Sequence, residues 1–280
     1  MLADYHIHSR YSDDSEEEME VIVLSAIEKG FDEICLTDHV DYGVKIEHEE
    51  YLKLDDEKKK ITNSNVDYPS YFKEIEELQK KYGNRIKIKK GLEFGMQVHT
   101  IPQFQNLFNR YEMDFVILSC HQVENKEFWI GDFQKGKTSD EYNSEYYNEI
   151  YKVINQYDNY SILGHLDLIQ RYNKEFEGDI HPFEKNREII EKILKKVIKS
   201  GKGIEVNTSS FAYGLEDLTP AREILKMYYN LDGKVITVGS DSHRAKDIGR
   251  HIAYIYEELK KIGFKYICTF ENMKPVFHTL

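Results

Sequence analysis

Short apolar segments alternate with longer amphipathic segments along most of the chain. Residues 182–200 carry apolar side chains at helical spacing and are followed by Gly201, which is typical of an amphipathic helix with a glycine stop. Gly203–Val206 and Phe115–Leu118 are instead short apolar runs, which favour buried strands. On this basis we expect strands at residues 2–8, 31–36, 85–95, 115–118, 160–163, 203–206 and 234–238. We expect helices at about residues 16–29, 71–82, 139–157, 182–200, 219–230 and 247–262, with another opening at residues 100–102 and a final segment near residues 266–270.

A strand followed by a helix recurs about seven times, and this alternation indicates parallel strands joined by crossover helices. Two architectures have this order, a closed barrel and an open doubly wound sheet. Residues 41–67 and 122–137 interrupt the alternation as long loops or insertions, and loops of this length are often functional, for instance as lids. We expect one barrel domain over residues 1–280, because an α/β barrel needs about 250 residues.

Histidines and carboxylates gather where the expected strands end. In His6-Ile7-His8, successive side chains point to opposite faces of the strand, so the two imidazoles share a face about 6.6 Å apart. An open sheet collects ligands at one switch point, whereas a barrel collects them from the C-terminal ends of nearly all its strands. The sequence therefore predicts an α/β barrel with a metal site at the strand C-terminal ends. The residues at these ends are His6, His8, His39, Glu93, His121, His165, Asp241 and His243.

The residue types in this set suit only a few kinds of metal ion. Imidazoles and carboxylates without thiolates favour zinc, manganese or iron over calcium, and strand alternation turns Cys120 away from the histidines. Eight or nine ligands are too many for one ion, so we expect two or three divalent transition-metal ions with a carboxylate bridging a pair. Ions about 3.5–4 Å apart can share a hydroxide and promote displacement at phosphorus. The alternative is a metal-binding barrel without catalytic activity.

Net charge and composition limit the classes of partner that we expect the protein to bind. The formal net charge is −12, which argues against charge-driven binding to nucleic acids or anionic membranes. Bound divalent ions reverse this sign locally, so a small anionic substrate is compatible with it. The three cysteines are scattered, and no apolar run reaches 18 residues. We therefore expect a cytoplasmic protein without a disulfide framework, as a monomer or small homo-oligomer.

Six motifs resemble those of the polymerase and histidinol phosphatase (PHP) superfamily, in particular its histidinol-phosphatase branch. They are DYHIHSRYSDDS, LTDH, GLEFG, GHLDLIQRY, EVNTS and GSDSHR, and they span almost the whole chain. The resemblance implies a distorted (β/α)7 TIM-like barrel that usually holds three metal ions. It implies that His6, His8, Glu93 and Asp241 hold the first ion and that Glu93, His121 and His165 hold the second. His39, His243 and Asp14 would hold the third, with the neighbouring Asp13 as the alternative to Asp14.

The resemblance also implies a metal-dependent phosphomonoesterase. The expected reaction converts L-histidinol phosphate and water to L-histidinol and phosphate in histidine biosynthesis, by attack of a hydroxide that bridges two ions. His243, His39 or a water on the third ion would protonate the leaving alkoxide. The alternative substrates are another small phosphomonoester, a nucleotide or phosphotyrosine.

Substrate recognition needs donors for the phosphate. We expect Arg171 to bind the phosphate and to assist catalysis, since a guanidinium matches phosphate geometry. The alternative is a surface arginine that pairs with Glu175 or Glu177. Arg244 and Asn207 are further candidates for substrate binding, although a polar turn also explains Asn207. Three aromatic residues of the loop at 122–137 are expected to contact the cationic amine and the imidazole: Phe128, Trp129 and Phe133.

Overall fold

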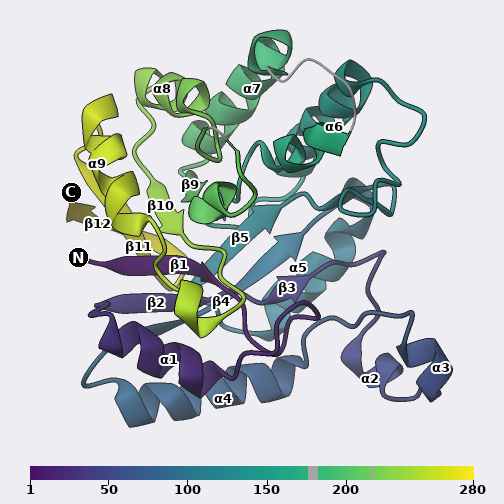
Figure 1. Ribbon diagram of the computed structural model, residues 1–280, viewed down its shortest axis with the longest axis vertical. Coiled ribbons are helices and arrows are strands. Elements are labelled where there is room, and N and C mark those ends of the chain that lie inside the picture. The colour runs from purple at the N-terminus through teal and green to yellow at the C-terminus, as the bar shows by residue number, and fades with distance from the viewer. Residues whose placement is uncertain (176–181, 216) are drawn as a thin grey trace.

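Parallel strands form the centre of the molecule (Figure 1). In the computed structural model, which describes residues 1–175, 182–215 and 217–280, seven of them follow one another in the order β1-β2-β4-β5-β8-β9-β10. Ile7 bridges Ser242 in parallel, and the His8 amide donates to the Ser242 carbonyl at 2.9 Å. This contact joins the first strand to the segment after the last, so the barrel is nearly closed, and the predicted barrel is confirmed over the open sheet. The strands are β1 (Ala3–Ile7), β2 (Glu33–Leu36), β4 (Lys87–Gly95), β5 (Phe115–Ser119), β8 (Ile162–Leu163), β9 (Gly203–Asn207) and β10 (Ile236–Gly239).

One strand of the barrel is broken just before a predicted site residue. Leu36 of β2 lies opposite Lys90, and His39 of β3 (His39–Val40) lies opposite Glu93. The register of β3 on β4 therefore continues that of β2, with a break at Thr37 and Asp38. The break leaves His39 directly beside Glu93.

Helices surround the strands and bury their apolar faces against them (Figure 1). In α4, apolar side chains at Tyr71, Ile75 and Leu78 are buried, and the Asp67 carboxylate caps the first turn by accepting from the Ser70 amide. None of the described helices is long and apolar enough to cross a membrane. The main helices are α1 (Met19–Glu28), α4 (Tyr68–Tyr82), α5 (Ile101–Arg110), α6 (Ser139–Ile154), α7 (Pro182–Lys199), α8 (Arg222–Asn230) and α9 (Ile252–Ile262). Short 3-10 turns span Val98–Thr100, Leu168–Glu175, Thr208–Phe211 and Ala245–Asp247.

The first helix begins later than the pattern predicted, at Met19 instead of residue 16. The preceding polar side chains hold another loop instead of capping the helix. The Ser15 hydroxyl donates to the His243 carbonyl at 3.0 Å, and Glu17 accepts from the Ala245 amide at 2.8 Å. These contacts tie the segment after β1 to the loop after β10, on the side where the predicted site lies.

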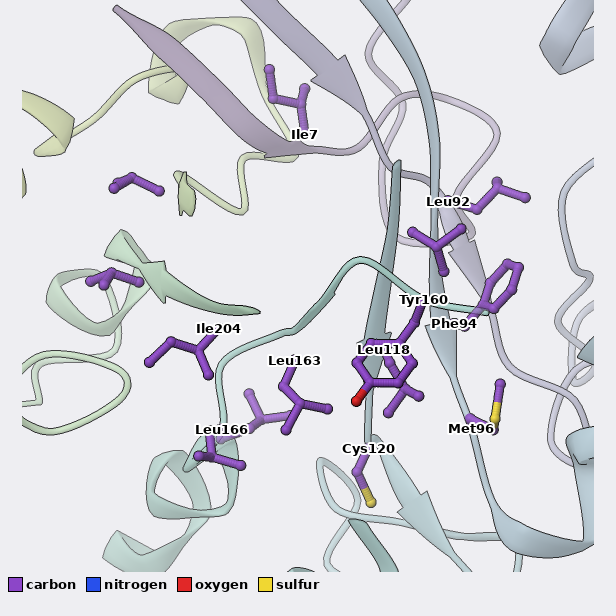
Figure 2. Close-up of a cluster of buried hydrophobic side chains, with 14 of the residues drawn as sticks. Ile7, Leu92, Phe94, Met96, Leu118, Cys120, Tyr160, Leu163, Leu166 and Ile204 are labelled. Atoms are coloured by element: carbon purple, nitrogen blue, oxygen red, sulfur yellow. The ribbon is translucent and has the colours of Figure 1, made fainter. Parts of the chain in front are cut away.

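Strand alternation separates an apolar layer from the polar centre of the barrel. Leu92 and Phe94 flank Glu93, and Leu118 and Cys120 flank Ser119. Figure 2 shows these four apolar side chains within one buried cluster. Cys120 therefore belongs to the apolar core, as the alternation predicted.

A C-terminal hairpin packs at the N-terminal end of the barrel. Its strands, β11 (Tyr266–Glu271) and β12 (Lys274–Thr279), pair antiparallel. Phe270 lies 5.0 Å from Phe115 between ring centroids, and its amide donates to the Tyr5 hydroxyl at 2.7 Å. The hairpin thereby seals the end of the barrel opposite the predicted site.

The two long loops contain only short elements. The segment at 41–67 includes the single-turn helices α2 (His48–Tyr51) and α3 (Asp56–Lys59), which lie to one side of the barrel (Figure 1). The segment at 122–137 begins with a small hairpin, β6 (Gln122–Val123) and β7 (Lys126–Glu127).

Candidate metal centre

The structure brings all nine sequence-predicted metal ligands to the C-terminal end of the barrel. They form three groups of side chains whose nitrogen and oxygen atoms face one another. The first group contains His6, His8, Glu93 and Asp241, the second Glu93, His121 and His165, and the third Asp14, His39 and His243.

The first group lies deepest in the barrel. Glu93 Oε2 is 3.2 Å from His6 Nε2 and 3.7 Å from His8 Nε2, and Asp241 Oδ1 is 3.6 Å and 3.2 Å from the same two atoms. The side chains of His6, His8 and Glu93 are fully buried. Four potential ligand atoms therefore surround one point.

The second group uses the other oxygen of the same glutamate. Glu93 Oε1 lies 3.1 Å from His121 Nε2 and 2.8 Å from His165 Nε2, and the Ser119 hydroxyl donates to it at 2.6 Å. Glu93 therefore links the first and second groups, one oxygen to each.

The third group lies nearer the solvent and distinguishes the two candidate aspartates. Asp14 Oδ2 is 3.0 Å from His243 Nε2 and 3.5 Å from His39 Nε2. Asp13 points elsewhere, since its carboxylate pairs with Lys45 Nζ at 2.5 Å. Asp14 is thus the aspartate beside both histidines.

The electrostatics of these groups suit metal ions. Among the described residues, the buried atoms His6 Nε2, His8 Nε2 and Glu93 Oε2 have no hydrogen-bond partner, although uncompensated buried polar atoms are costly. Burial lowers the pKa of His8 to about 3, helped by the nearby His39 and His243, so His8 is neutral, as a metal ligand must be. Burial alone would raise the pKa of Glu93, but the neighbouring histidines outweigh it and hold that pKa well below its usual range. Despite burial, the nearby carboxylates raise the pKa of four other histidines, so an arriving ion would displace their protons; these are His6, His39, His121 and His243. The neutral imidazoles and ionised carboxylates that result are the donor set that zinc and similar transition metals prefer.

Three outer residues that the sequence analysis missed orient the histidines. His6 Nδ1 lies 2.6 Å from Glu205 Oε1, His121 Nδ1 lies 2.8 Å from Asp41 Oδ1, and His8 Nδ1 lies 3.2 Å from the Ser12 hydroxyl. Such partners fix which ring nitrogen faces the metal. Glu205 had a visible signal, a lone charge between Ile204 and Val206 in an apolar strand. Asp41 follows His39 by two residues and shares its face of an extended segment.

Arg171 joins the cluster from the side of Asp241. Its Nη2 donates to Asp241 Oδ2 at 3.1 Å and to the Asn207 side-chain oxygen at 3.3 Å, and it also contacts the Ser209 hydroxyl. Its Nε is buried and has no hydrogen-bond partner among the described residues. The sequence alone allows Glu175 and Glu177 as alternative ion-pair partners of Arg171. Glu177 and the side chain of Glu175 lie outside the part of the chain that the structure describes.

Asn207 and Arg244 occupy different surroundings. Asn207 is fully buried, and its amide donates to Asp241 Oδ2 at 3.2 Å. Its side chain also contacts Arg171 and Glu205, and it does not line the cavity described below. Arg244 is exposed and does not line that cavity either.

A cavity of about 430 Å³ opens over the second and third groups. Its wall includes Lys45, Arg171 and the aromatic residues Trp129, Tyr172 and Tyr213. Only Trp129 of the expected aromatic trio takes part. Phe128 and Phe133 are each 1% exposed and pack on one another at 4.9 Å between ring centroids, so the expectation that they contact a substrate is wrong because they complete the core.

Comparisons with known proteins agree on one family. The model of the PHP domain matches residues 4–209. The chain is 34% identical over 272 residues to a histidinol-phosphatase of Lactococcus lactis subsp. lactis, covering 97% of this chain and 95% of that protein. It is 30% identical over 267 residues to a probable histidinol-phosphatase of Thermotoga maritima, with 95% and 94% covered. A crystal structure of the histidinol phosphate phosphatase from Lactococcus lactis, complexed with zinc, L-histidinol and phosphate, is similar with a TM-score of 0.85 and 33% identity over 98% of both chains.

Proposed function

Because this chain belongs to the PHP domain family, we propose that it is a metal-dependent histidinol-phosphatase, which hydrolyses L-histidinol phosphate to L-histidinol and phosphate in histidine biosynthesis. One observation carries the proposal. The chain shares its fold, over nearly its whole length, with a histidinol phosphate phosphatase crystallised with zinc, L-histidinol and phosphate. The three groups of histidines and carboxylates offer the kind of ligand atoms that such an enzyme needs for its metal ions.

We assign one divalent ion to each of the three groups, with zinc as the first candidate and manganese or iron as alternatives. Glu93 would bridge the first two ions, because its two oxygens face different histidines. When bound, such ions lower the pKa of a coordinated water toward about 7 and withdraw charge from phosphoryl oxygens. No serine or cysteine nucleophile is then required.

The protein itself supplies the contacts to the phosphate. Arg171 lines the cavity, and its guanidinium would donate to a phosphate oxygen there, while its Nη2 is held by Asp241 and Asn207. Asn207 would thus act by positioning Arg171 and Asp241. His39 and His243 lie on the more open side of the cluster, with side chains 13% and 28% exposed. Either histidine would supply the proton for the leaving alkoxide if it does not bind the third ion; if both bind it, a water on that ion would supply the proton.

The cavity wall also suits the organic part of the substrate. Glu127 and Trp129 line the cavity, and the Trp129 indole NH donates to Glu127 Oε1 at 3.1 Å. A carboxylate beside an aromatic face favours a cationic amine or an imidazolium. L-Histidinol phosphate carries both an amine and an imidazole.

A panel of phosphate esters tests the substrate. We expect kcat/KM for histidinol phosphate to exceed that for tyrosine phosphate, AMP and glycerol phosphate by at least ~100-fold, about 2.7 kcal/mol of differential transition-state binding. A flat profile, or failure to restore growth of a histidinol-phosphatase-deficient strain, would remove the substrate assignment. The metal centre would then serve another small phosphomonoester, a nucleotide or phosphotyrosine.

Two variants separate phosphate binding from specificity. Arg171→Ala should lower kcat/KM for every ester alike, whereas Trp129→Ala should act mainly on histidinol phosphate. Arg244→Ala is the matched arginine control, because Arg244 is exposed outside the cavity. If Arg244→Ala costs as much as Arg171→Ala, the phosphate binds on the other side of the cluster.

A further inference from the structure

A buried lysine lies at the edge of the metal centre. Lys45 belongs to the segment at 41–67, and its side chain is only 8% exposed. Its Nζ lies 2.5 Å from Asp13 Oδ1 and 2.9 Å from Asp41 Oδ2. A lysine is rarely buried unless it is paired, and here both partners are carboxylates from different loops.

Contacts continue from Lys45 into the second group. Asp41 uses one oxygen for Lys45 and the other for His121 Nδ1, at 2.8 Å. His121 Nε2 then lies 3.1 Å from Glu93 Oε1. The series from Lys45 through Asp41 to His121 therefore ends at the carboxylate that two ions would share.

The backbone beneath this series makes room for the contact between Asp41 and His121. A side-chain carbon at Gly95 would lie 1.8 Å from Asp41 Oδ1 and 2.7 Å from His121 Nδ1. Asp41 and His121 therefore meet directly over Gly95. The second glycine of GLEFG permits this close approach.

The physical role of the lysine follows from the burial of Asp41, whose side chain is 4% exposed. A buried carboxylate is costly unless it is paired. An ionised carboxylate can only accept, so Asp41 accepts the hydrogen bond from Nδ1–H of His121, and the lone pair on Nε2 is left for an ion on the side of Glu93. Removing Lys45 would leave Asp41 buried without its cation and free to turn away from His121.

We propose that Lys45 is a positioning residue that, through Asp41, fixes the orientation and tautomer of His121 for metal binding at the second group. This inference rests on the proposed metal centre. It adds a residue from the segment at 41–67, outside the strand-end motifs, to the machinery of that centre.

The test measures zinc affinity of chelator-stripped protein by competition with a chromophoric chelator. Lys45→Met should weaken the binding of one ion by ~10–100-fold, the range seen when an outer partner of a metal ligand is lost. Lys45→Arg should restore most of the affinity, because the guanidinium keeps the charge. Lys58→Met is the matched control, since Lys58 lies in the same segment but is 65% exposed, and it should bind zinc like the wild type.

A second variant guards against a simple folding defect. Asp41→Asn keeps the size of the side chain and should weaken zinc binding about as much as Lys45→Met. In the double variant, the loss of zinc affinity should be smaller than the sum of the two single losses. Asp13→Asn should weaken zinc binding less than Asp41→Asn, because Asp13 pairs with Lys45 whereas Asp41 contacts His121 directly.

The outcomes are distinguishable. If the wild type binds neither zinc nor manganese nor iron, the proposed metal centre fails, and the proposed function fails with it. If the wild type binds zinc but Lys45→Met or Asp41→Asn binds it equally well, Lys45 is not a positioning residue for His121. A larger loss of zinc affinity in Asp13→Asn than in Asp41→Asn would overturn the inference as well.

Discussion

At the scale of single residues, the Glu93 carboxylate belongs to two groups of ligands, with one oxygen in each. Oε2 faces His6 and His8, and Oε1 faces His121 and His165. His39 of the third group also approaches Glu93, with Nδ1 2.9 Å from Oε2, while its Nε2 faces Asp14 at 3.5 Å. Loss of the glutamate should therefore disturb two ions, whereas loss of His39 should disturb chiefly one.

Glu93→Ala should consequently lose more metal than His39→Ala. We expect elemental analysis of protein purified without chelator to find about two or three ions per wild-type chain, about one fewer in His39→Ala, and about one or none in Glu93→Ala. The exposed Glu57→Ala, far from the cluster, should retain the wild-type content. Equal losses in the two cluster variants would contradict the bridging role of Glu93.

Sequence reasoning at this scale located side chains that follow a strand and missed those that act across the barrel. His121 could be found because it directly follows an apolar run. Its partner Asp41 lies 80 positions earlier, and only the closed barrel brings the two together. Phe128 and Phe133 were misjudged for a related reason, because a loop without periodicity does not reveal which side chains enter the core.

At the scale of elements, the order of strands and helices was predictable because each has its own apolar period. The residue at which a helix begins was less predictable. α1 shows this, because Ser15 and Glu17 bind a loop more than 200 residues further along the chain. The final strand β12 was not predicted at all. Its turn places Asn272 and Met273 at positive φ, 49° and 63°, and methionine is not a residue that signals such a turn.

The C-terminal hairpin offers a stability test with a control on its own second strand. Phe270 is 2% exposed and packs on Phe115, whereas Phe277 on β12 is 47% exposed. Phe270→Ala should lower the free energy of unfolding by about 3–5 kcal/mol, because it leaves a cavity in the barrel end. Phe277→Ala should change it by less than about 0.5 kcal/mol.

Denaturant titration would measure both variants. Zinc content should stay at the wild-type level in each, since the hairpin lies at the end of the barrel opposite the metal centre. A similar cost for Phe270→Ala and Phe277→Ala would mean that the hairpin does not stabilise the barrel through its buried face.

At the scale of the whole molecule, the cluster joins parts of the chain from residue 6 to residue 243. Barrel closure depends on the same region, because the bridge between Ile7 and Ser242 lies between metal-facing residues on both strands. The sequence predicts the barrel through the polar residues at its strand ends, but pairing of the first and last strands leaves no local pattern. Ions held there would link strands that otherwise meet through few hydrogen bonds.

Metal removal should therefore destabilise the entire barrel. Ligands that bind only the folded state stabilise it by about 2.7 kcal/mol at a hundredfold excess over Kd, which for a chain of this size corresponds to roughly 5–10 °C in Tm. We expect a thermal melt after chelation to show a decrease of this order, reversed by zinc but not by magnesium, which prefers oxygen ligands. Glu93→Ala should show a smaller decrease, because it would have less metal to lose. If elemental analysis confirms that the metal is gone and Tm does not change, the bound ions do not stabilise the barrel. The cluster would then serve catalysis alone.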